Sequence, residues 1–122
     1  MAEHNDFGKE AENFAANYLQ KLGYAIVARN YRYQKAELDL ITRLGDLLVV
    51  VEVKARQHDT MVAPQSAVDR KKIQRIILAT DDFLNAYPDD VEVRFDIISI
   101  LKTPQQTLEL THIKNAFESV DF

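Results

Sequence analysis

The sequence predicts an α/β protein in which a central mixed β-sheet of about five strands is flanked by helices. Two segments show apolar residues at helical spacing, and five segments read as strands separated by turn residues. The first three strands follow one another closely, which favours an antiparallel meander. A long helix precedes the fourth strand, which allows that strand to pair in parallel with a neighbour.

The composition fits a single soluble domain spanning residues 1–122. Hydrophobic residues make up 47% of the chain and charged residues 28%, and cysteine is absent, so no disulfide or thiolate metal site is expected. The N-terminal residues are polar and acidic, unlike a signal peptide. No apolar run approaches the roughly 20 residues of a membrane span. We therefore expect a cytoplasmic protein with no membrane segment.

The first element is an amphipathic helix over residues 6–22. Asn5 or Asp6 can cap its N-terminus, and Gly23 suits the position after its last turn. Glu10 and Glu12 fall on the two shoulders of its apolar face. Taken alone, each glutamate is more simply explained as a solvated helix residue.

A strand over residues 24–30 follows and leads into a basic and aromatic segment. Arg29, Arg32 and Lys35 alternate there with Tyr31 and Tyr33. Such a segment can hold a phosphate backbone and stack on bases. It can equally be an exposed strand end whose long side chains cover apolar surface.

The segment 37–54 reads as a hairpin with a two-residue Gly45-Asp46 turn. Alternation puts Leu38 and Leu40 on one face of the first strand and Asp39 on the other. The turn sets Asp39 directly across from Glu52, and Glu37 across from Lys54. Because the second strand is apolar on both faces until Glu52, it is expected to be central and buried.

Two carboxylates facing each other across a ladder repel, and a buried charge needs a partner. A divalent cation between Asp39 and Glu52 would resolve this conflict. Lys54 would project from the same face as Glu52, about 7 Å further along the strand. Two acidic ligands and a nearby ammonium suit Mg²⁺ and a phosphate substrate. The alternative is that these residues are solvated strand ends with a cross-strand Glu37–Lys54 ion pair.

An irregular stretch over residues 55–65 contains Arg56, His58 and Asp59, and is long enough to cover a site. His58 could serve as a base, although a lone loop histidine is more often solvated. A helix capped by Ser66 is then expected to run through Tyr87. The first turns of this helix carry four basic residues, Arg70, Lys71, Lys72 and Arg75.

The remaining elements are a strand over residues 91–101 and a short edge strand over residues 108–113. A tail over residues 115–122 is expected to dock Phe117 and Val120 on the core.

Charge is segregated along the chain, although the net charge is only −4. Residues 20–75 carry eleven basic and six acidic side chains, whereas residues 76–122 carry three and nine. The basic part also holds the hairpin, so the charge can steer a polyanion to that face. The alternative is that these cations only solvate the surface.

The hairpin motif, Asp39 followed by Glu52-Val53-Lys54, resembles that of the PD-(D/E)xK nuclease superfamily with its restriction-endonuclease-like fold. The closer resemblance is to the bacterial YraN family, which is similar to archaeal Holliday junction resolvases. It extends through most of the chain, over residues 8–12, 15–19, 23–24, 29–32, 36–41, 51–56, 67–69, 71–72 and 94–96. The chain departs from the family at Ala11 and Ala36, where glycine is common, and at residues 61–62.

The resemblance implies a single endonuclease-like domain with Mg²⁺ or Mn²⁺ as cofactor. Asp39 and Glu52 would hold the metal, together with the carbonyl of Val53. Lys54 would orient or deprotonate the attacking water, and Glu12 matches a helix glutamate that resolvase-like nucleases add to the site.

Two functions therefore remain open. The first is a metal-dependent nuclease acting on phosphodiester bonds, with branched DNA as one substrate, in repair or recombination. The second is a non-catalytic nucleic-acid-binding or assembly module that keeps the fold. In both cases the expected partner is nucleic acid, with DNA favoured, and a homodimer is allowed. The expected nucleic-acid contacts are Arg29, Arg32, Lys35, Arg56, Lys71 and Lys72.

Overall fold

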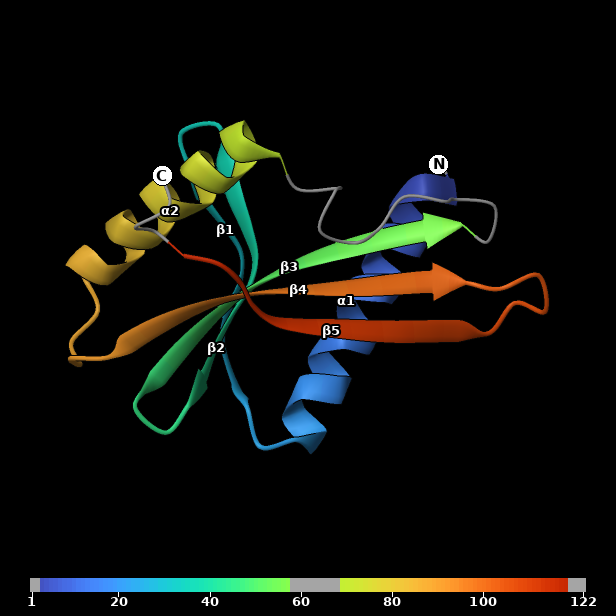
Figure 1. Ribbon diagram of the computed structural model, residues 1–122, viewed down its shortest axis with the longest axis horizontal. Helices are drawn as coiled ribbons and strands as arrows, with labels where there is room; N and C mark the ends of the chain where they lie inside the picture. Colours follow the sequence, from blue (N-terminus) through green and yellow to red (C-terminus); the bar gives the residue numbers. More distant parts are fainter. Residues whose placement is uncertain (1–2, 58–68, 119–122) are drawn as a thin grey trace.

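The computed structural model describes residues 3–57 and 69–118. Two helices and five strands make up this part of the chain (Figure 1). In chain order they are α1 (Glu3–Lys21), β1 (Ala25–Tyr33), β2 (Ala36–Leu44), β3 (Leu47–Gln57), α2 (Arg70–Asn85), β4 (Glu92–Lys102) and β5 (Leu108–Phe117). This is the predicted α/β class, and it is consistent with a restriction-endonuclease-like fold.

The strands form one mixed sheet in the order β1-β2-β3-β4-β5. β1, β2 and β3 pair antiparallel, β3 and β4 pair in parallel, and β4 and β5 pair antiparallel. The parallel pair follows from α2, because a crossover helix returns the chain to the same end of the sheet. The predicted meander, the parallel neighbour and the central place of β3 are confirmed.

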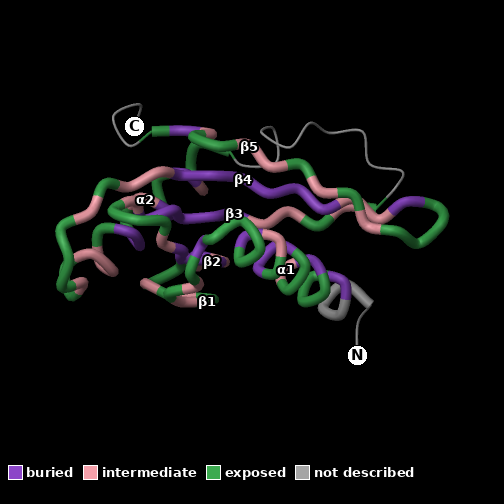
Figure 2. Tube along the Cα trace, turned by 90° about the horizontal axis from the view of Figure 1, so that it is seen from below, coloured by how far each residue is buried: buried purple, intermediate pink, exposed green. Residues whose placement is uncertain are grey.

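The two helices cover opposite faces of the sheet, and each closes its own core. Figure 1 shows α1 crossing behind β3, β4 and β5, while α2 lies at the other end beside the β1–β2 hairpin. Leu19 of α1 packs with Val49 and Val51, whereas Ile76 of α2 packs with Leu48 and Val50. In Figure 2 the buried residues concentrate along β3 and β4. The middle of the sheet is therefore closely packed on both faces, and the site residues on β3 project from it.

The turn between β2 and β3 is the predicted one. Gly45 has φ +62°, a conformation that glycine adopts without strain, and Leu44 lies opposite Leu47. The β2–β3 ladder then runs from this pair to Leu40 opposite Val51. Asp39 with Glu52, and Glu37 with Lys54, lie beyond the last pair of the ladder.

The predicted alternation along β2 is wrong at one place. Leu38 packs in the core under α2, whereas Leu40 packs in the core under α1. Simple alternation would have put both on one face. The difference coincides with the end of the ladder, where the β1–β2 hairpin twists away from β3 (Figure 1). Asp39 lies between the two leucines, at the point where β2 stops pairing with β3.

Several helix and strand boundaries differ from the prediction. α1 begins at Glu3, so Asn5 and Asp6 lie inside the helix and do not cap it. β1 continues through the basic and aromatic segment to Tyr33 because that segment pairs with β2. β5 extends to Phe117, whose ring stacks on Phe95 at 5.0 Å between centroids. The first three residues of the predicted tail are therefore strand, and Val120 lies outside the described residues.

The start of α2 also differs from the prediction. The helix begins at Arg70 and Asp69 is its N-cap, accepting a hydrogen bond from the backbone N–H of Lys72 at 2.8 Å. The predicted cap, Ser66, lies outside the described residues. Asp69 satisfies one of the free N–H groups of the first turn as effectively as serine would.

A buried polar network ties α1 to β4 and β5. The carboxylate of Asp96 accepts hydrogen bonds from Arg94, from His112 Nε2 at 2.7 Å and from the backbone N–H of Asn115 at 3.0 Å. The other ring nitrogen of His112 bonds the hydroxyl of Tyr18 on α1 at 2.9 Å. Asp96 is completely buried, and these hydrogen bonds offset the cost of burying its charge.

Candidate metal and nucleic-acid site

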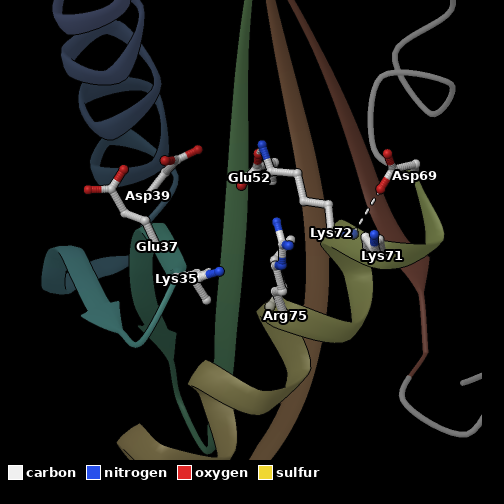
Figure 3. A pocket seen from close by; sticks show the side chains of 10 residues that line it. Lys35, Glu37, Asp39, Glu52, Asp69, Lys71, Lys72 and Arg75 are labelled. Carbon is white, nitrogen blue, oxygen red and sulfur yellow. Dashed lines mark hydrogen bonds and ion pairs between the residues drawn. The ribbon is translucent and has the colours of Figure 1, made fainter.

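A pocket of about 380 Å³ opens between β2, β3 and the first two turns of α2. Its walls carry opposite charges (Figure 3). Three of the acidic side chains come from the two strands and the fourth, Asp69, is the N-cap of α2, while the basic ones come from α2 and from the β1–β2 turn. The lining residues are Lys35, Ala36, Glu37, Asp39, Glu52, Asp69, Lys71, Lys72, Arg75 and Ile76.

Asp39 enters this pocket because the ladder between β2 and β3 stops beside it. Its carboxylate takes the place of a backbone acceptor and receives the N–H of Val53 at 2.8 Å. Burial, repulsion from Glu52 and a hydrogen bond with Glu52 raise the pKa of Asp39 to about 8, against the smaller opposing effects of the Val53 N–H and Lys72. The protein thus holds two carboxyl groups together where only one readily carries charge.

Glu52 is almost completely buried, with 5% of its side chain exposed, and two lysines surround it. The Nζ atom of Lys72 lies 2.5 Å from Oε2 of Glu52, and Nζ of Lys54 lies 4.0 Å from the same atom. Burial and the nearby Lys72 charge lower the pKa of Lys54. Burial alone would also lower the pKa of Lys72, but its hydrogen bond and attraction to Glu52 outweigh burial and raise it. Lys54 is therefore the lysine that gives up a proton more easily.

The donor set fits a hard divalent cation that keeps several water ligands. Asp39 and Glu52 present carboxylate oxygens to each other, and a cation between them would remove the repulsion that raises the pKa of Asp39. Within residues 3–57 and 69–118, no group of three or more His, Cys, Asp or Glu side chains could hold a metal. Mg²⁺ is commonly bound by one or two carboxylates, with water and substrate phosphate completing its shell. Two carboxylates are therefore sufficient for Mg²⁺ but not for a closed structural site.

Glu12 lies close to this site without lining the pocket. Its Oε2 atom accepts a hydrogen bond from Asn30 Nδ2 at 3.1 Å. Burial raises the pKa of Glu12, with Arg29 lowering it and Glu37 adding to the rise. Glu10, on the other shoulder of α1, pairs with Lys102 at 3.6 Å instead. Of the two helix glutamates, Glu12 is the one that faces the acidic strands.

The six predicted nucleic-acid contacts divide into two groups. Lys35, Lys71 and Lys72 line the pocket. Arg29, Arg32 and Arg56 do not line it, and the first two are held by neighbours. Arg29 donates to Asn13 at 2.7 Å, and Arg32 pairs with Glu37 at 3.5 Å.

Arg56 lies on the same face of β3 as Glu52 and Lys54, at the far end of that strand. Its Nε and Nη1 atoms are buried and have no hydrogen-bond partner within the described part of the chain. Such a charge is costly to bury, so an anionic ligand at this end of β3 would stabilise it.

The pocket lies in the part of the chain that matches a recognised protein family. Residues 11–100 match the model of "Uncharacterised protein family UPF0102". This range includes the second half of α1, all of β1 to β3 and α2, most of β4, and all the pocket residues.

The chain belongs to UPF0102.

Curated UPF0102 relatives match nearly the whole chain. A UPF0102 protein of Phocaeicola vulgatus is 46% identical over 119 residues, covering 96% of each chain. One from Christiangramia forsetii is 44% identical over 117 residues, covering 96% of this chain and 98% of its own. One from Parabacteroides distasonis is 43% identical, covering 96% of each chain.

Several pocket features of this UPF0102 protein were not foreseen from its sequence. Arg75 and Asp69 line the pocket, Lys72 pairs with Glu52, and Glu37 pairs with Arg32 in place of Lys54. The signal for Arg75 and Asp69 is that each lies three residues from Lys72, because residues three apart share one helix face. The predicted base His58 and the residues 61–62 lie outside the described residues. Neither helix in the described part is long and apolar enough to span a membrane.

Proposed function

We propose that this UPF0102 protein is a divalent-metal-dependent endonuclease that hydrolyses phosphodiester bonds in DNA. The observation that carries the proposal is the Asp39–Glu52 pair inside a pocket with a cationic rim. A buried glutamate that is hydrogen-bonded to a half-buried aspartate is unfavourable without a cation, and the cations around them favour a polyanionic substrate. A role in DNA repair or recombination and a cytoplasmic location accompany the proposal.

Asp39 and Glu52 would hold Mg²⁺ or Mn²⁺, with the carbonyl of Val53 as a further ligand. When bound, the metal supplies an activated water and stabilises the charge that develops on the phosphate. Lys54 lies on the same strand face as Glu52 and has a lowered pKa. These two properties support its role in orienting or deprotonating the attacking water. Glu12 would assist from α1.

The basic rim would hold the phosphates that flank the scissile bond. Lys35, Lys71 and Arg75 line the pocket and make no ion pair within the described part of the chain, so their charges are available to a ligand. Arg56 would bind a phosphate further along β3. The distance from Lys54 to Arg56 along the strand, about 7 Å, resembles the separation of neighbouring phosphates in a nucleic-acid strand.

A non-catalytic nucleic-acid-binding module is the second candidate, and one observation favours it. Glu52 already has a cationic partner in Lys72, and no third acidic ligand joins the pair within the described residues. In that case the pocket would bind phosphate through its lysines and need no metal.

The decisive experiment is cleavage of a labelled four-way DNA junction, with linear duplex and single strand alongside. Each substrate is incubated with Mn²⁺ or with chelator, using the wild type, Asp39→Ala and Lys54→Ala. We expect Mn²⁺-dependent cleavage that both substitutions abolish while circular dichroism reports an intact fold. Lys21→Ala, an exposed lysine outside the pocket, serves as the matched control for Lys54→Ala and should cleave normally.

Two outcomes would contradict the assignment of nuclease activity to this pocket. Cleavage by Asp39→Ala would show that the activity does not come from this pocket. Failure of the folded wild type to cut any substrate, together with an unchanged melting temperature in Mn²⁺, would favour the binding module. Resolvase-like cutting of both strands also requires two sites, so the junction product and the solution mass together test the homodimer.

A further inference from the structure

Lys72 reaches across the pocket from α2 to Glu52 on β3 (Figure 3). Its ammonium group lies 2.5 Å from the Glu52 carboxylate, closer than any other cation of the described residues comes to either site carboxylate. The Lys72 side chain is 40% exposed, whereas that of Glu52 is 5% exposed. The lysine can therefore move into solvent, but the carboxylate cannot.

This contact occupies an oxygen of the carboxylate that would bind the metal. A metal ion and an ammonium group at contact distance from that oxygen would repel each other, because both are cations. Lys72 neutralises only one of the two carboxyl groups, since Asp39 still has a raised pKa. A divalent ion bridging both carboxylates would satisfy the two charges together.

We infer that Lys72 is an internal counter-ion that competes with the divalent cation for Glu52, so that metal binding releases the Lys72 ammonium to bind substrate phosphate. This inference rests on the proposed function, because it requires the metal to bind at Asp39 and Glu52. The released lysine would join Lys71 and Arg75 on the first turns of α2. Metal binding and phosphate binding would then strengthen each other, by the reciprocity that links any two coupled ligands.

The neighbouring residue provides a matched control. Lys71 lies on the same helix, lines the same pocket and makes no ion pair within the described part of the chain. Lys71→Met and Lys72→Met remove the same charge from the same region, so they alter the general electrostatic field of the pocket similarly. Only the second substitution removes the contact with Glu52.

The test is the affinity of the full-length protein for Mn²⁺ by isothermal titration calorimetry, without nucleic acid. We expect Lys72→Met to bind Mn²⁺ tighter than Lys71→Met by about tenfold, as befits the loss of a close competing charge. Lys72→Gln, which can still donate a hydrogen bond to Glu52, should behave like Lys72→Met and guards against a folding defect in one variant.

Thermal unfolding gives a second readout that needs no activity. Without metal, Lys72→Met should melt below Lys71→Met, because the buried Glu52 has lost its nearest partner. Saturating Mn²⁺ should reverse that order.

Equal Mn²⁺ affinities for the Lys71 and Lys72 variants would show that Lys72 does not compete with the metal for Glu52. The proposed metal site would not be affected by that result. No Mn²⁺ binding by the wild type or by any folded variant would overturn the metal site itself, and the proposed function with it. The two failures are therefore distinguishable.

Discussion

The side chain of Asp39 accepts the backbone N–H of Val53 at 2.8 Å, across the point where β2 and β3 stop pairing. A side-chain oxygen thus replaces a backbone carbonyl as the acceptor for β3. This replacement keeps the N–H of Val53 satisfied and fixes the Asp39 carboxyl group beside Glu52. The site is held together by the same hydrogen bond that ends the ladder.

Asp39→Asn should stabilise the metal-free protein. The raised pKa of Asp39, about 8, means that folding disfavours its ionised form. The contribution of Asp39 to stability should therefore be complete below about pH 4 and be lost as the pH rises to about 8. Asparagine can still accept the Val53 N–H but never ionises, so the variant should lack this loss. We expect a gain on the order of 2 kcal/mol at pH 8, because each unit of pKa shift corresponds to about 1.4 kcal/mol and the neighbouring lysines moderate it.

Urea denaturation in chelator between pH 4 and pH 9 measures this effect. Glu37→Gln, in the same pocket wall, is the control, and its gain in the free energy of unfolding should not increase with pH. Parallel pH profiles for the wild type and Asp39→Asn would mean that Asp39 ionises normally in the folded protein.

Glu12→Gln tests whether the helix glutamate is a metal ligand. Because Glu12 bonds Asn30 and does not line the pocket, we expect the variant to bind Mn²⁺ within about threefold of the wild type, a difference of less than 1 kcal/mol. Asp39→Ala should abolish binding in the same calorimetric assay. A complete loss of Mn²⁺ binding in Glu12→Gln would place Glu12 among the ligands.

Arg75→Met should weaken DNA binding in a way that depends on salt. If Arg75 contacts a phosphate, its removal should reduce the slope of log affinity against log salt concentration by about 0.7 to 0.9. The slope is measured by fluorescence anisotropy with a single-stranded oligonucleotide in chelator, where no cleavage occurs. Lys21→Met removes a charge outside the pocket and should leave the slope unchanged. Equal slopes for all three proteins would exclude a phosphate contact at Arg75.

Asp96→Asn should destabilise the fold by about 3 kcal/mol, since it leaves the partly buried Arg94 and the buried His112 without their carboxylate partner. Burial alone would raise the pKa of Asp96, but the hydrogen bonds it accepts outweigh burial and lower it. Its stabilising effect is therefore complete above about pH 4 and lost as the pH falls further.

The difference in the free energy of unfolding between the wild type and Asp96→Asn should consequently be smaller in acid. Urea denaturation at pH 3 and pH 7 measures this difference. Tyr18→Phe removes one neutral hydrogen bond of the same network and should cost about 1 kcal/mol at both pH values. The same difference in the free energy of unfolding at both pH values would mean that the charge of Asp96 does not contribute to stability.

The sequence predicted the sheet well because its signals are local. The Gly45-Asp46 turn determines the register of Leu44 and Leu47, and α2 explains why β4 runs parallel to β3. The prediction was wrong at Leu38 and Leu40 because alternation assumes a regular strand, and the end of a ladder is a property of the whole hairpin. The boundary of α2 depended on which residue caps it, and both Ser66 and Asp69 have suitable side chains.

The strand part of the site was predictable, whereas the helix part was not. Asp39 and Glu52 come from one hairpin, so their proximity follows from turn geometry alone. Lys72 and Arg75 reach the pocket through the packing of α2 on the sheet, which local spacing does not determine. Spacing shows that Asp69, Lys72 and Arg75 share a helix face, but not which strand residue that face meets.

β3 contributes to both cores and to the site, which has a consequence for folding accuracy. Its even-numbered positions end in Glu52, Lys54 and Arg56, and its odd-numbered positions hold the valines under α1. A one-residue shift in the register of this strand would place three charged side chains in the hydrophobic core beneath α1. Molecules with a shifted β3 register would therefore be too unstable to accumulate. The register that forms the hydrophobic core is thus also the register that places the site residues correctly.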